Sequence, residues 1–583
     1  MKKILSVILM SCLLLSLCTA FVGCAPNEEE QPDPNRTQLY VGLRESGLGK
    51  AWLQKAKQEY EKENPEIQVM IDYLASELDG GTLARTMPEI RQTVIFTNSL
   101  TVTTLAPQNS VNATYHVADI TDIVTEGGED SIMNRMEETT ADFFNYGTEE
   151  EPKYYMVPYF NSIYGMVYDR DMFAEYKFFN LECTDTLEGE RAGKKYAGLD
   201  CTLGTPDDNC GPDGQPNTID DGLPATWEDF KLLLDVMVDV GVTPFTYSAK
   251  EKGYQNRFLS SIWASYEGAS NYSIMVDLEG YHTGLQEEIT MANAWKLAKT
   301  DGKKAALKVA DHLINGRKDQ HGNSLYVESG VRHTSHTAMT AQSNFLNSWP
   351  NPQMKDIAFI LEGNWWEYEA TEIFDECAEL YTDVGDGTWG YGERNFGYFP
   401  FPKFKGSYET DGIPDQTNTM TTLGSNISTN NAAGFINAYH TEEQIALGKD
   451  FLKFCMSNEM HGEFTRITGI TRPYKYTMSD AQLEDLTNYA RSVYEFNQSE
   501  YVEKARSCSM LDVYYYEEEF LTEAFTFGTI VDTELGTKDL YPMHAFLVGI
   551  GNNARKIGFE EYWEGIDRYI NESIWMQKMS KYM

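Results

Sequence analysis

The sequence predicts an α/β protein that is divided into at least two lobes. Its 583 residues are too many for one hydrophobic core, because single cores stop growing at about 250–300 residues. Hydrophobic residues make up 42% of the chain and aromatic residues 13%, which is typical of a globular rather than a disordered protein. Strand-like and helix-like periodicities alternate along the chain, and this alternation indicates parallel sheets covered by helices.

The N-terminal residues predict a secretory signal. Lys2 and Lys3 precede the apolar run 4–22, and a glycine and Cys24 follow it. A charged start, a short apolar centre and a small residue at the cut site are typical of a cleaved signal peptide. A cysteine directly after the cut is similar to a bacterial lipobox, whose thiol receives a diacylglycerol. We expect removal of residues 1–23 and lipidation of Cys24, which would anchor the protein to the outer face of the bacterial cell membrane. A plain signal peptide and an uncleaved membrane anchor are the alternatives.

The charge of the chain narrows the classes of partner. Lys and Arg number 47 against 89 Asp and Glu, giving a net charge of −42, or 45 − 89 = −44 once the two lysines of the signal are removed. Nucleic-acid binding needs clustered basic residues that neutralise phosphates, so we expect no nucleic-acid partner. The same charge opposes adsorption to anionic lipid through protein charge and favours solubility. After residue 24 no apolar run reaches the ~20 residues of a membrane span.

The first predicted elements form a strand–helix–strand unit. Residues 24–36 are rich in Pro, Glu and Asn and predict a linker that holds a domain away from a membrane. A strand is expected at 38–43, and a helix at 52–60 places its apolar side chains on one face. Alternating apolar positions predict a second strand at 67–73. Strand, helix and strand over about 35 residues make a βαβ unit with parallel strands.

The same pattern returns twice further along the chain. Thr226 and the acidic residues after it are typical of a helix start, and the helix is expected to stop at Gly241. Residues 242–247 then predict a strand. Thr441 begins another capping box, followed by a helix that includes 446–456.

Cysteine usage does not predict a disulfide framework, because six cysteines remain in a large chain after the signal and Cys24. Cys377 and Cys455 fall in helical apolar patterns and are expected to be buried free thiols. Cys201 and Cys210 lie in a polar loop and are close enough for one bridge in an oxidising compartment. A bridge and two free thiols both remain open for this pair.

Residues 181–226 predict an insertion loop without a helix or strand. Its centre is dense in Asp, Asn, Gly and Pro, and so long a loop inside a compact protein is usually functional or organised by a metal. Hard oxygen ligands this close together suit a structural Ca²⁺, although the EF-hand spacing is not met. A set of Asx turns without metal is the alternative. The candidate ligands of the cation are Asp200, Asp207, Asp208, Asp213, Asn217, Asp220 and Asp221.

Five short segments, together with the helix at 446–456, carry a recognisable order and spacing. They are FNSIYGMVYDRDMF at 160–173, LPATWEDF at 223–230, IAFILEGNWW at 357–366, NFGYFPFP at 395–402 and GITRP at 469–473. This series resembles extracellular solute-binding proteins of carbohydrate ABC transporters, the family that includes maltose-binding protein.

The resemblance implies a two-lobed, type II periplasmic-binding-protein-like fold, in which each lobe is a mostly parallel sheet flanked by helices. The N-terminal lobe would comprise 36–160 plus 403–470, and the C-terminal lobe 161–402 plus 471–583. A carbohydrate ligand would bind in the cleft between the lobes, where the carboxyl ends of strands converge. The implied partners are the permease subunits of an ABC transporter; we expect a monomer that requires no cofactor.

A sugar presents hydroxyl groups and apolar C–H faces, so its site needs flat aromatic surfaces next to planar donors and acceptors. Residues of these types occur after the first strand, at the first crossover, in one helix, after an apolar strand and in a Gly-rich run. These candidate ligand contacts are Arg44, Glu45, Tyr159, Asn161, Trp263, Asn364, Trp365, Trp366, Trp389 and Tyr391. The alternatives are a solvated surface pair for Arg44 and Glu45, hinge packing for the crossover pair, and core packing for Trp263, Trp389 and Tyr391.

The leading hypothesis is a lipid-anchored, non-enzymatic receptor that captures a sugar or oligosaccharide between two lobes and delivers it to an ABC permease. One alternative is a lipid-anchored glycoside hydrolase, which would need two carboxylates across the glycosidic bond. Another is a surface lipoprotein that adheres to polysaccharide without lobe closure. The sequence contains no Gly-x-Ser-x-Gly elbow, His-Glu-x-x-His pair or phosphate loop, which would mark other enzyme classes.

Overall fold

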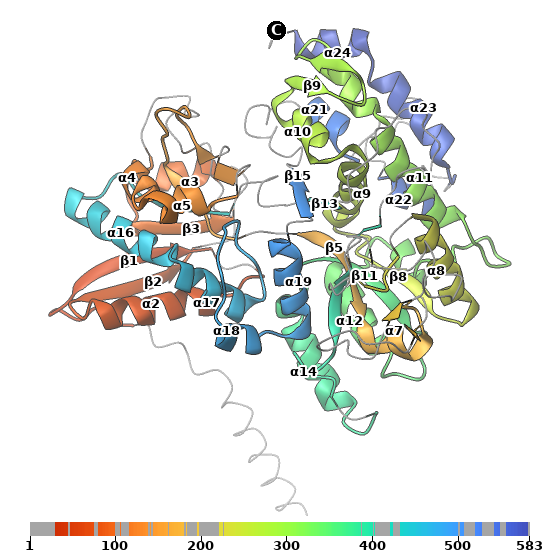
Figure 1. The fold of residues 1–583 in the computed structure, drawn as a ribbon, viewed down its shortest axis with the longest axis horizontal. Coiled ribbons are helices and arrows are strands. Elements are labelled where there is room, and N and C mark those ends of the chain that lie inside the picture. The colour runs from red at the N-terminus through yellow and green to blue at the C-terminus, as the bar shows by residue number, and fades with distance from the viewer. Residues whose placement is uncertain are drawn as a thin grey trace, which may run out of the picture.

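Two separate β-sheets, each with its own helices and hydrophobic core, divide the chain into two lobes that lie side by side (Figure 1). The predicted two-lobed α/β organisation is thus confirmed. The computed structural model describes residues 30–44, 47–74, 80–98, 105, 116–137, 140–141, 144–160, 163–179, 182–183, 195–196, 211, 221–224, 227–385, 388–399, 401–402, 420–423, 432–499, 502–505, 519–527, 541–548 and 555–580.

The N-terminal lobe is built on a five-stranded sheet with the order β2-β1-β3-β14-β4. Its strands are β1 (Thr37–Leu43), β2 (Ile67–Tyr73), β3 (Val94–Asn98), β4 (Met156–Pro158) and β14 (Ala432–Ile436). β1 runs parallel to both β2 and β3, and α2 (Ala51–Glu63) connects β1 to β2. The predicted βαβ unit is therefore confirmed. α2 buries Trp52, Leu53, Ala56 and Tyr60, the apolar face that the sequence indicated.

The C-terminal lobe is built on a four-stranded sheet with the order β12-β5-β11-β8. Its strands are β5 (Tyr164–Asp169), β8 (Thr243–Thr246), β11 (Ile357–Gly363) and β12 (Phe396–Phe399). β11 is parallel to β8 and antiparallel to β5, and β12 is also antiparallel to β5. The helix α8 (Trp227–Asp239) precedes β8 as predicted.

The prediction of mostly parallel sheets is confirmed for both lobes, and each sheet also contains one reversed strand. β14 is antiparallel to its neighbours β3 and β4, and β5 is antiparallel to β11 and β12. Each of these two strands follows a segment of the opposite lobe in the chain. A strand that enters from the other lobe starts at the edge where its neighbours end, and it therefore runs against them. The remaining strands of both sheets consequently direct their carboxyl ends toward the partner lobe.

Helices cover the sheet of the N-terminal lobe and close its core. α16 (Glu442–Cys455) begins where predicted, and the Thr441 hydroxyl caps it by accepting a hydrogen bond from the backbone amide of Gln444. α16 packs on β14, and α17 (Asn458–Thr468) packs on α2. The other helices of this lobe are α3 (Gly80–Thr86), α4 (Thr121–Thr125), η3 (Gly128–Asp130), α5 (Ile132–Arg135) and α18 (Asp480–Glu484).

The last crossing between the lobes occurs later in the chain than the expected boundary at residue 470. Tyr474 and Met478 still belong to the core of the N-terminal lobe. The crossing follows in α19 (Asn488–Gln498), which lies between the lobes in Figure 1. Ala490 of this helix packs into the N-terminal core, whereas Tyr489 packs with β5 and β12 of the C-terminal lobe. Because the two faces of one helix serve two cores, the sequence pattern gives no sharp boundary here.

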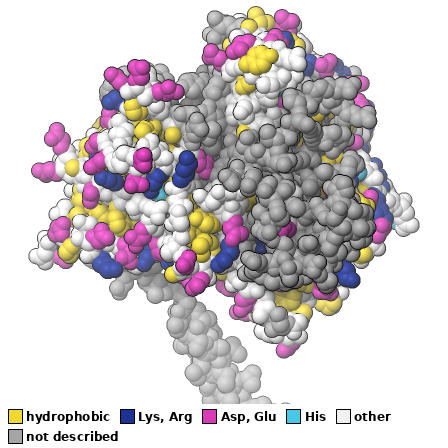
Figure 2. All heavy atoms as spheres, in the orientation of Figure 1, with side chains coloured by type: hydrophobic (Ala, Val, Ile, Leu, Met, Phe, Trp, Pro, Cys, Tyr) yellow, Lys and Arg dark blue, Asp and Glu magenta, His cyan; other side chains and the backbone are white. Residues whose placement is uncertain are grey.

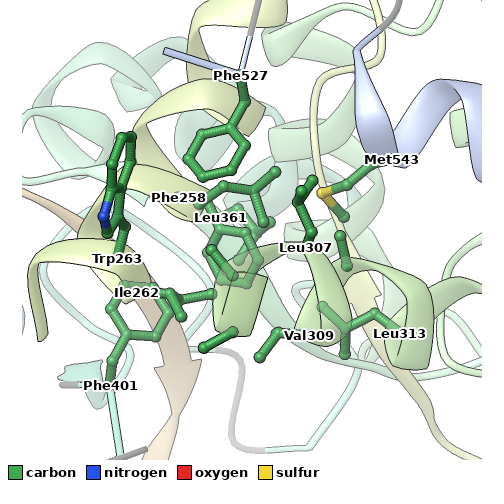
Figure 3. Close-up of a cluster of buried hydrophobic side chains, with 14 of the residues drawn as sticks. Phe258, Ile262, Trp263, Leu307, Val309, Leu313, Leu361, Phe401, Phe527 and Met543 are labelled. Atoms are coloured by element: carbon green, nitrogen blue, oxygen red, sulfur yellow. The ribbon is translucent and has the colours of Figure 1, made fainter. Parts of the chain in front are cut away.

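The C-terminal part of the chain completes the core of the second lobe. Phe258, Ile262 and Trp263 of α9 face Leu307 of α11, with Phe527 beside them (Figure 3). Besides α8 and α19, the helices of the C-terminal lobe are α7 (Arg170–Tyr176), α9 (Lys252–Glu267), α10 (Ala269–Asp277), η5 (Ala294–Lys299), α11 (Asp301–Asn315), η6 (Ser329–Arg332), α12 (Ala338–Ser348), α13 (Trp366–Glu369), α14 (Thr371–Leu380), α21 (Glu519–Phe525), α22 (Pro542–Leu547), α23 (Phe559–Tyr569) and α24 (Glu572–Met579). Three two-stranded sheets pair β6 (Glu182–Cys183) with β7 (Lys195–Tyr196), β9 (Gly280–His282) with β10 (Glu287–Ile289), and β13 (Met420–Leu423) with β15 (Val502–Ala505).

Several predictions fall wholly or partly outside the described residues. The signal, Cys24, Cys201, Cys210 and every candidate calcium ligand except the buried Asp221 are among them. Within the described part of the chain, no group of three His, Cys, Asp or Glu side chains is placed to hold a metal ion. Cys377 and Cys455 are buried free thiols, as expected. No helix among the described residues is long and apolar enough to cross a membrane.

Candidate functional site

The turn after β11 connects the C-terminal lobe to the first crossover. Asn364 is buried, and its backbone amide donates to the carbonyl of Ile163 over 2.9 Å, while its side-chain oxygen accepts from the Ile163 amide over 3.2 Å. The next residue, Trp365, lies across Gly363: a Cβ added to that glycine would stand 2.2 Å from the indole ring. Only glycine therefore allows this placement of the indole.

Three aromatic side chains gather around this turn. Tyr164, the first residue of β5, meets Trp365 edge to face, with 4.9 Å between ring centroids. Tyr254 of α9 lies 6.2 Å from Tyr164 and 6.4 Å from Trp365 by the same measure. The guanidinium carbon of Arg257, one turn further along α9, stands 5.7 Å from the Tyr164 ring centroid. All four side chains are partly exposed, so the cluster presents both ring faces and polar groups.

Two glutamates next to the aromatic cluster share one amide. The Gln342 side-chain nitrogen donates to Glu362 Oε1 over 3.1 Å and to Glu369 Oε2 over 2.9 Å. Gln342 and Glu362 are buried, and Glu369 is half-buried. Burial, and after it the neighbouring Glu369 charge, raises the pKa of Glu362 to about 8, since a low-dielectric site disfavours the carboxylate. Burial also raises the pKa of Glu369.

The N-terminal lobe touches this cluster through a glycine loop. A Cβ on Gly47 would stand 3.3 Å from Glu369 Oε1 and 3.7 Å from Trp365, and one on Gly49 would stand 2.8 Å from the Tyr368 hydroxyl. The loop follows β1 and leads into α2, and Trp365 also packs against the N-terminal core. Gly49 has a φ of +61°, which favours glycine. The aromatic and acidic side chains of one lobe therefore meet the end of the first strand of the other.

The N-terminal side of this region holds Arg44 and Tyr159. Arg44 directly follows β1, and its amide donates to the Phe96 carbonyl. Tyr159 is fully buried and stacks on Trp52 at 5.5 Å between centroids. Burial raises the pKa of its phenol, and among the described residues its hydroxyl has no hydrogen-bond partner. This packing fits the alternative of a hinge residue, and the ligand contact expected of Tyr159 stays a prediction. Glu45 and Asn161, their predicted companions, lie outside the described residues.

The other predicted aromatic contacts are placed in hydrophobic cores. Trp263 and Trp366 expose none of their surface; Trp263 donates to the Thr300 hydroxyl over 2.9 Å, and Trp366 packs among Phe345, Phe396 and Tyr489. Both indoles are thus part of hydrophobic cores in this structure, and the ligand contacts expected of them stay predictions. Trp389 is buried and Tyr391 packs against the same core, which is the alternative named for both.

The structure also brings together residues that sequence reasoning missed: Tyr164, Tyr254, Gln342, Glu362 and Glu369. Glu362 carries a readable signal, because it is the one acid in an otherwise apolar strand. Tyr164 lies within a segment that carried the family resemblance. Gln342 and Tyr254 belong to helices whose sequences gave no such signal, and only the packing of α9 and α12 around β11 places them here.

The arrangement suits an uncharged ligand with many hydroxyl groups. The rings of Tyr164, Tyr254 and Trp365 offer flat apolar surface with polar edges. The partly exposed Glu369 adds polar oxygens, and the buried Gln342 and Glu362 behind it hold this carboxyl group in place. A set of donors and acceptors fixed by Gln342 favours ligands that can satisfy all of them.

Comparisons with known proteins give structural similarity at low sequence identity. No family model matches the sequence, and no curated protein matches it. Among solved structures, maltose-bound MalE3 of T. maritima is 12% identical, with a TM-score of 0.48 over 92% of this chain and 99% of that one. Ligand-free RafE of Streptococcus pneumoniae is 14% identical, with a TM-score of 0.47 over 85% and 98%. The Thermus thermophilus maltotriose-binding protein is 13% identical, with a TM-score of 0.46 over 91% and 100%.

Proposed function

We propose that this protein is the substrate-binding component of an ABC importer, which captures a sugar or oligosaccharide between its lobes and delivers it to the membrane permease. The observation that carries the proposal is the meeting of the Tyr164–Tyr254–Trp365 cluster and the Glu362–Gln342–Glu369 group with the glycine loop of the opposite lobe. The ordered segments that resemble carbohydrate-binding relatives support it from the sequence.

Capture would proceed by lobe closure around the ligand. A ligand that contacts both lobes stabilises the closed form, and the population shifts toward it in proportion to that difference in affinity. The paired hydrogen bonds between Asn364 and Ile163 hold the β11 turn to the first crossover, so the aromatic cluster would move with the hinge. The role is binding rather than catalysis.

Delivery would require the protein to stay near its permease. The charged start, apolar run and Cys24 support a lipid anchor on the outer face of the bacterial membrane. A tethered monomer would search for the permease in two dimensions, which raises its effective concentration at the transporter.

The test is a thermal-shift screen of the purified protein against mono- and oligosaccharides, followed by calorimetry with any hit. We expect one class of glycan to raise the melting temperature, and Trp365→Ala to abolish this shift. Tyr281→Ala, at a residue 57% exposed on β9, is the matched control and should bind as the parent does. A full panel without a shift, measured on folded protein, would contradict the proposal. Release of reducing ends from a bound glycan would contradict it as well, and would show instead that the protein is a glycoside hydrolase.

A further inference from the structure

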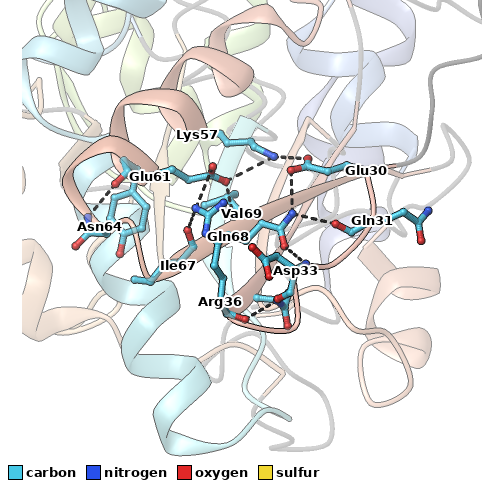
Figure 4. A network of polar contacts seen from close by, with 12 residues as sticks. Glu30, Gln31, Asp33, Arg36, Lys57, Glu61, Asn64, Ile67, Gln68 and Val69 are labelled. Atoms are coloured by element: carbon cyan, nitrogen blue, oxygen red, sulfur yellow. Dashed lines mark hydrogen bonds and ion pairs between the residues drawn. The ribbon is translucent and has the colours of Figure 1, made fainter.

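Part of the predicted linker is bound to the N-terminal lobe. Gln68 of β2 is 4% exposed, and its amide reaches three residues of the segment that precedes β1 (Figure 4). Its oxygen accepts from the Asp33 amide over 2.7 Å, and its nitrogen donates to Glu30 Oε1 and to the Gln31 carbonyl, each over 3.1 Å. We call residues 30–36 the N-terminal arm.

Charged side chains of α2 hold the same arm. Lys57 bonds to the Glu30 carboxylate and stands 3.6 Å from Glu61. Arg36 pairs with Glu61 over 3.2 Å and donates to the carbonyl of Ile67 (Figure 4). Burial opposes ionisation of Glu30, but the hydrogen bonds from Lys57 and Gln68 outweigh it and hold the pKa of Glu30 below its ordinary value.

The arm also folds back on itself before the sheet begins. The Arg36 amide donates to the Asp33 carbonyl over 3.1 Å, which closes a turn. The Gln38 side chain donates to the carbonyls of Asp33 and Arg36. β2 is an edge strand of its sheet, so the arm is fixed to one edge of the N-terminal lobe by backbone, amide and charged contacts together.

We propose that the arm is an orienting device, which turns the β2 edge of the N-terminal lobe toward the lipid bilayer. This inference rests on the proposed anchoring at Cys24. Only six residue steps separate Cys24 from Glu30, and they span at most about 20 Å even when fully extended. A free linker would instead allow thirteen steps to Thr37, or about 45 Å, with no preferred orientation.

The charge on the surface of the N-terminal lobe does not oppose the orientation that the short tether would impose. Figure 2 shows Asp and Glu side chains spread over the described surface of the N-terminal lobe, with Lys and Arg among them. Such a surface is not drawn onto anionic lipid, and screening limits repulsion to about 10 Å at 0.1 M salt. The tether length, rather than adsorption, therefore sets the distance between the lobe and the bilayer. The permease is left to approach faces other than the β2 edge.

The test measures energy transfer from the protein to a dye-labelled lipid in phosphatidylcholine–phosphatidylglycerol vesicles. A fluorescent donor is attached through a genetically encoded azido residue at Glu63, the last residue of α2, or at Tyr281 of β9. Figure 1 shows α2 and β9 in different lobes, far from each other. We expect strong transfer from position 63 and weak transfer from position 281. Equal transfer from both positions would overturn the proposal.

Releasing the arm supplies the matched comparison. The double variant Lys57→Ala/Gln68→Ala removes the hydrogen bonds of Gln68 and the ion pair of Lys57, which bind the arm to β2 and α2. The transfer efficiencies from the two donor positions should then become similar. Lys55→Ala lies on the same helix but pairs with Glu59, and it should behave as the parent does. Unchanged transfer in the double variant, measured with its melting temperature to show that it is folded, would also overturn the proposal.

Attachment through a nickel-chelating lipid separates this inference from the proposed anchoring. The chain from residue 24 onward carries an N-terminal hexahistidine segment in place of the acyl group, and the same two donor positions are compared. If the native chain does not partition to membranes, anchoring at Cys24 fails, while the nickel-bound protein still reports orientation. Sugar-induced thermal shifts, measured in parallel, report the proposed ligand function independently of both.

Discussion

Asn364 and Ile163 exchange two hydrogen bonds across 201 positions of sequence. Asn364 directly follows β11 of the C-terminal lobe, and Ile163 directly precedes β5, the strand that enters this lobe. The pair therefore fixes the aromatic turn of Trp365 to the hinge, and both residues are buried.

Replacing Asn364 by Leu should destabilise the protein, because the Ile163 amide would be left buried without an acceptor. An unsatisfied buried donor costs about 1–3 kcal/mol. Urea denaturation should show this loss as a lower midpoint. Asn458→Ala is the matched control, since its amide bonds with Thr477 are exposed, and its midpoint should hardly change. Equal effects of the two substitutions would contradict a special role for Asn364.

Gly363→Ala should weaken ligand binding. The new methyl group would occupy the space of the Trp365 indole, at 2.2 Å from its ring, so the ring has to move away from Tyr164. We expect at least a tenfold loss of glycan affinity, about 1.4 kcal/mol, by calorimetry. Gly253→Ala in α9 is the control, because the added methyl group has no other atom within 4 Å. This variant should keep full affinity, and its stability should rise by up to about 1 kcal/mol because alanine favours the helix over glycine.

Gly49→Ala should open the contact between the lobes. Its methyl group would stand 2.8 Å from the Tyr368 hydroxyl, in addition to the backbone strain of a φ of +61°. Gly128 shares this backbone conformation, with a φ of +63°, but has nothing within 4 Å. Both alanine variants should lose about 1–2 kcal/mol from strain, whereas only the first should increase the radius of gyration in X-ray scattering. An increase in both would point to strain alone.

Three buried glutamates should make the free energy of unfolding fall as the pH rises from about 6.5 to 8, above the range in which His282 and His461, whose pKa values burial lowers, act in the opposite direction. Burial raises the pKa of Glu362 to about 8 and that of Glu267 and Glu367 to about 7, against an ordinary value of 4.5. In this window the folded protein holds more protons than the unfolded chain, so stability is lost with increasing pH.

Glu362→Gln should remove part of that slope, because an amide does not ionise. We expect the variant to differ little from the parent at pH 5 and to be more stable on the order of 1–3 kcal/mol at pH 8. Urea denaturation at both pH values measures the difference, and Glu379→Gln, on the exposed surface of α14, is the control. A slope identical to that of the parent would show that Glu362 is ionised in the folded protein.

Local pattern determined much of this molecule. Periodicity and capping residues predicted β1, α2, β2, α8 and α16 close to their observed bounds, because helix and strand periods are properties of neighbouring residues. The resemblance of ordered segments predicted two lobes, and the sugar contact expected of the double tryptophan stays a prediction. Trp365 packs against the core of the N-terminal lobe, while Trp366 turns into the core of its own lobe.

Only tertiary structure decided which residues meet. The reversal of β5 and β14 depends on the lobe from which each strand enters, and the late crossing at α19 depends on two cores sharing one helix. Gln342, Glu362 and Tyr254 come from three separate elements, and the arm that looked like a linker is held by Gln68. Sequence fixes what each segment can form locally, whereas long-range packing selects the partners of each polar group, and in this protein those partners make the candidate site.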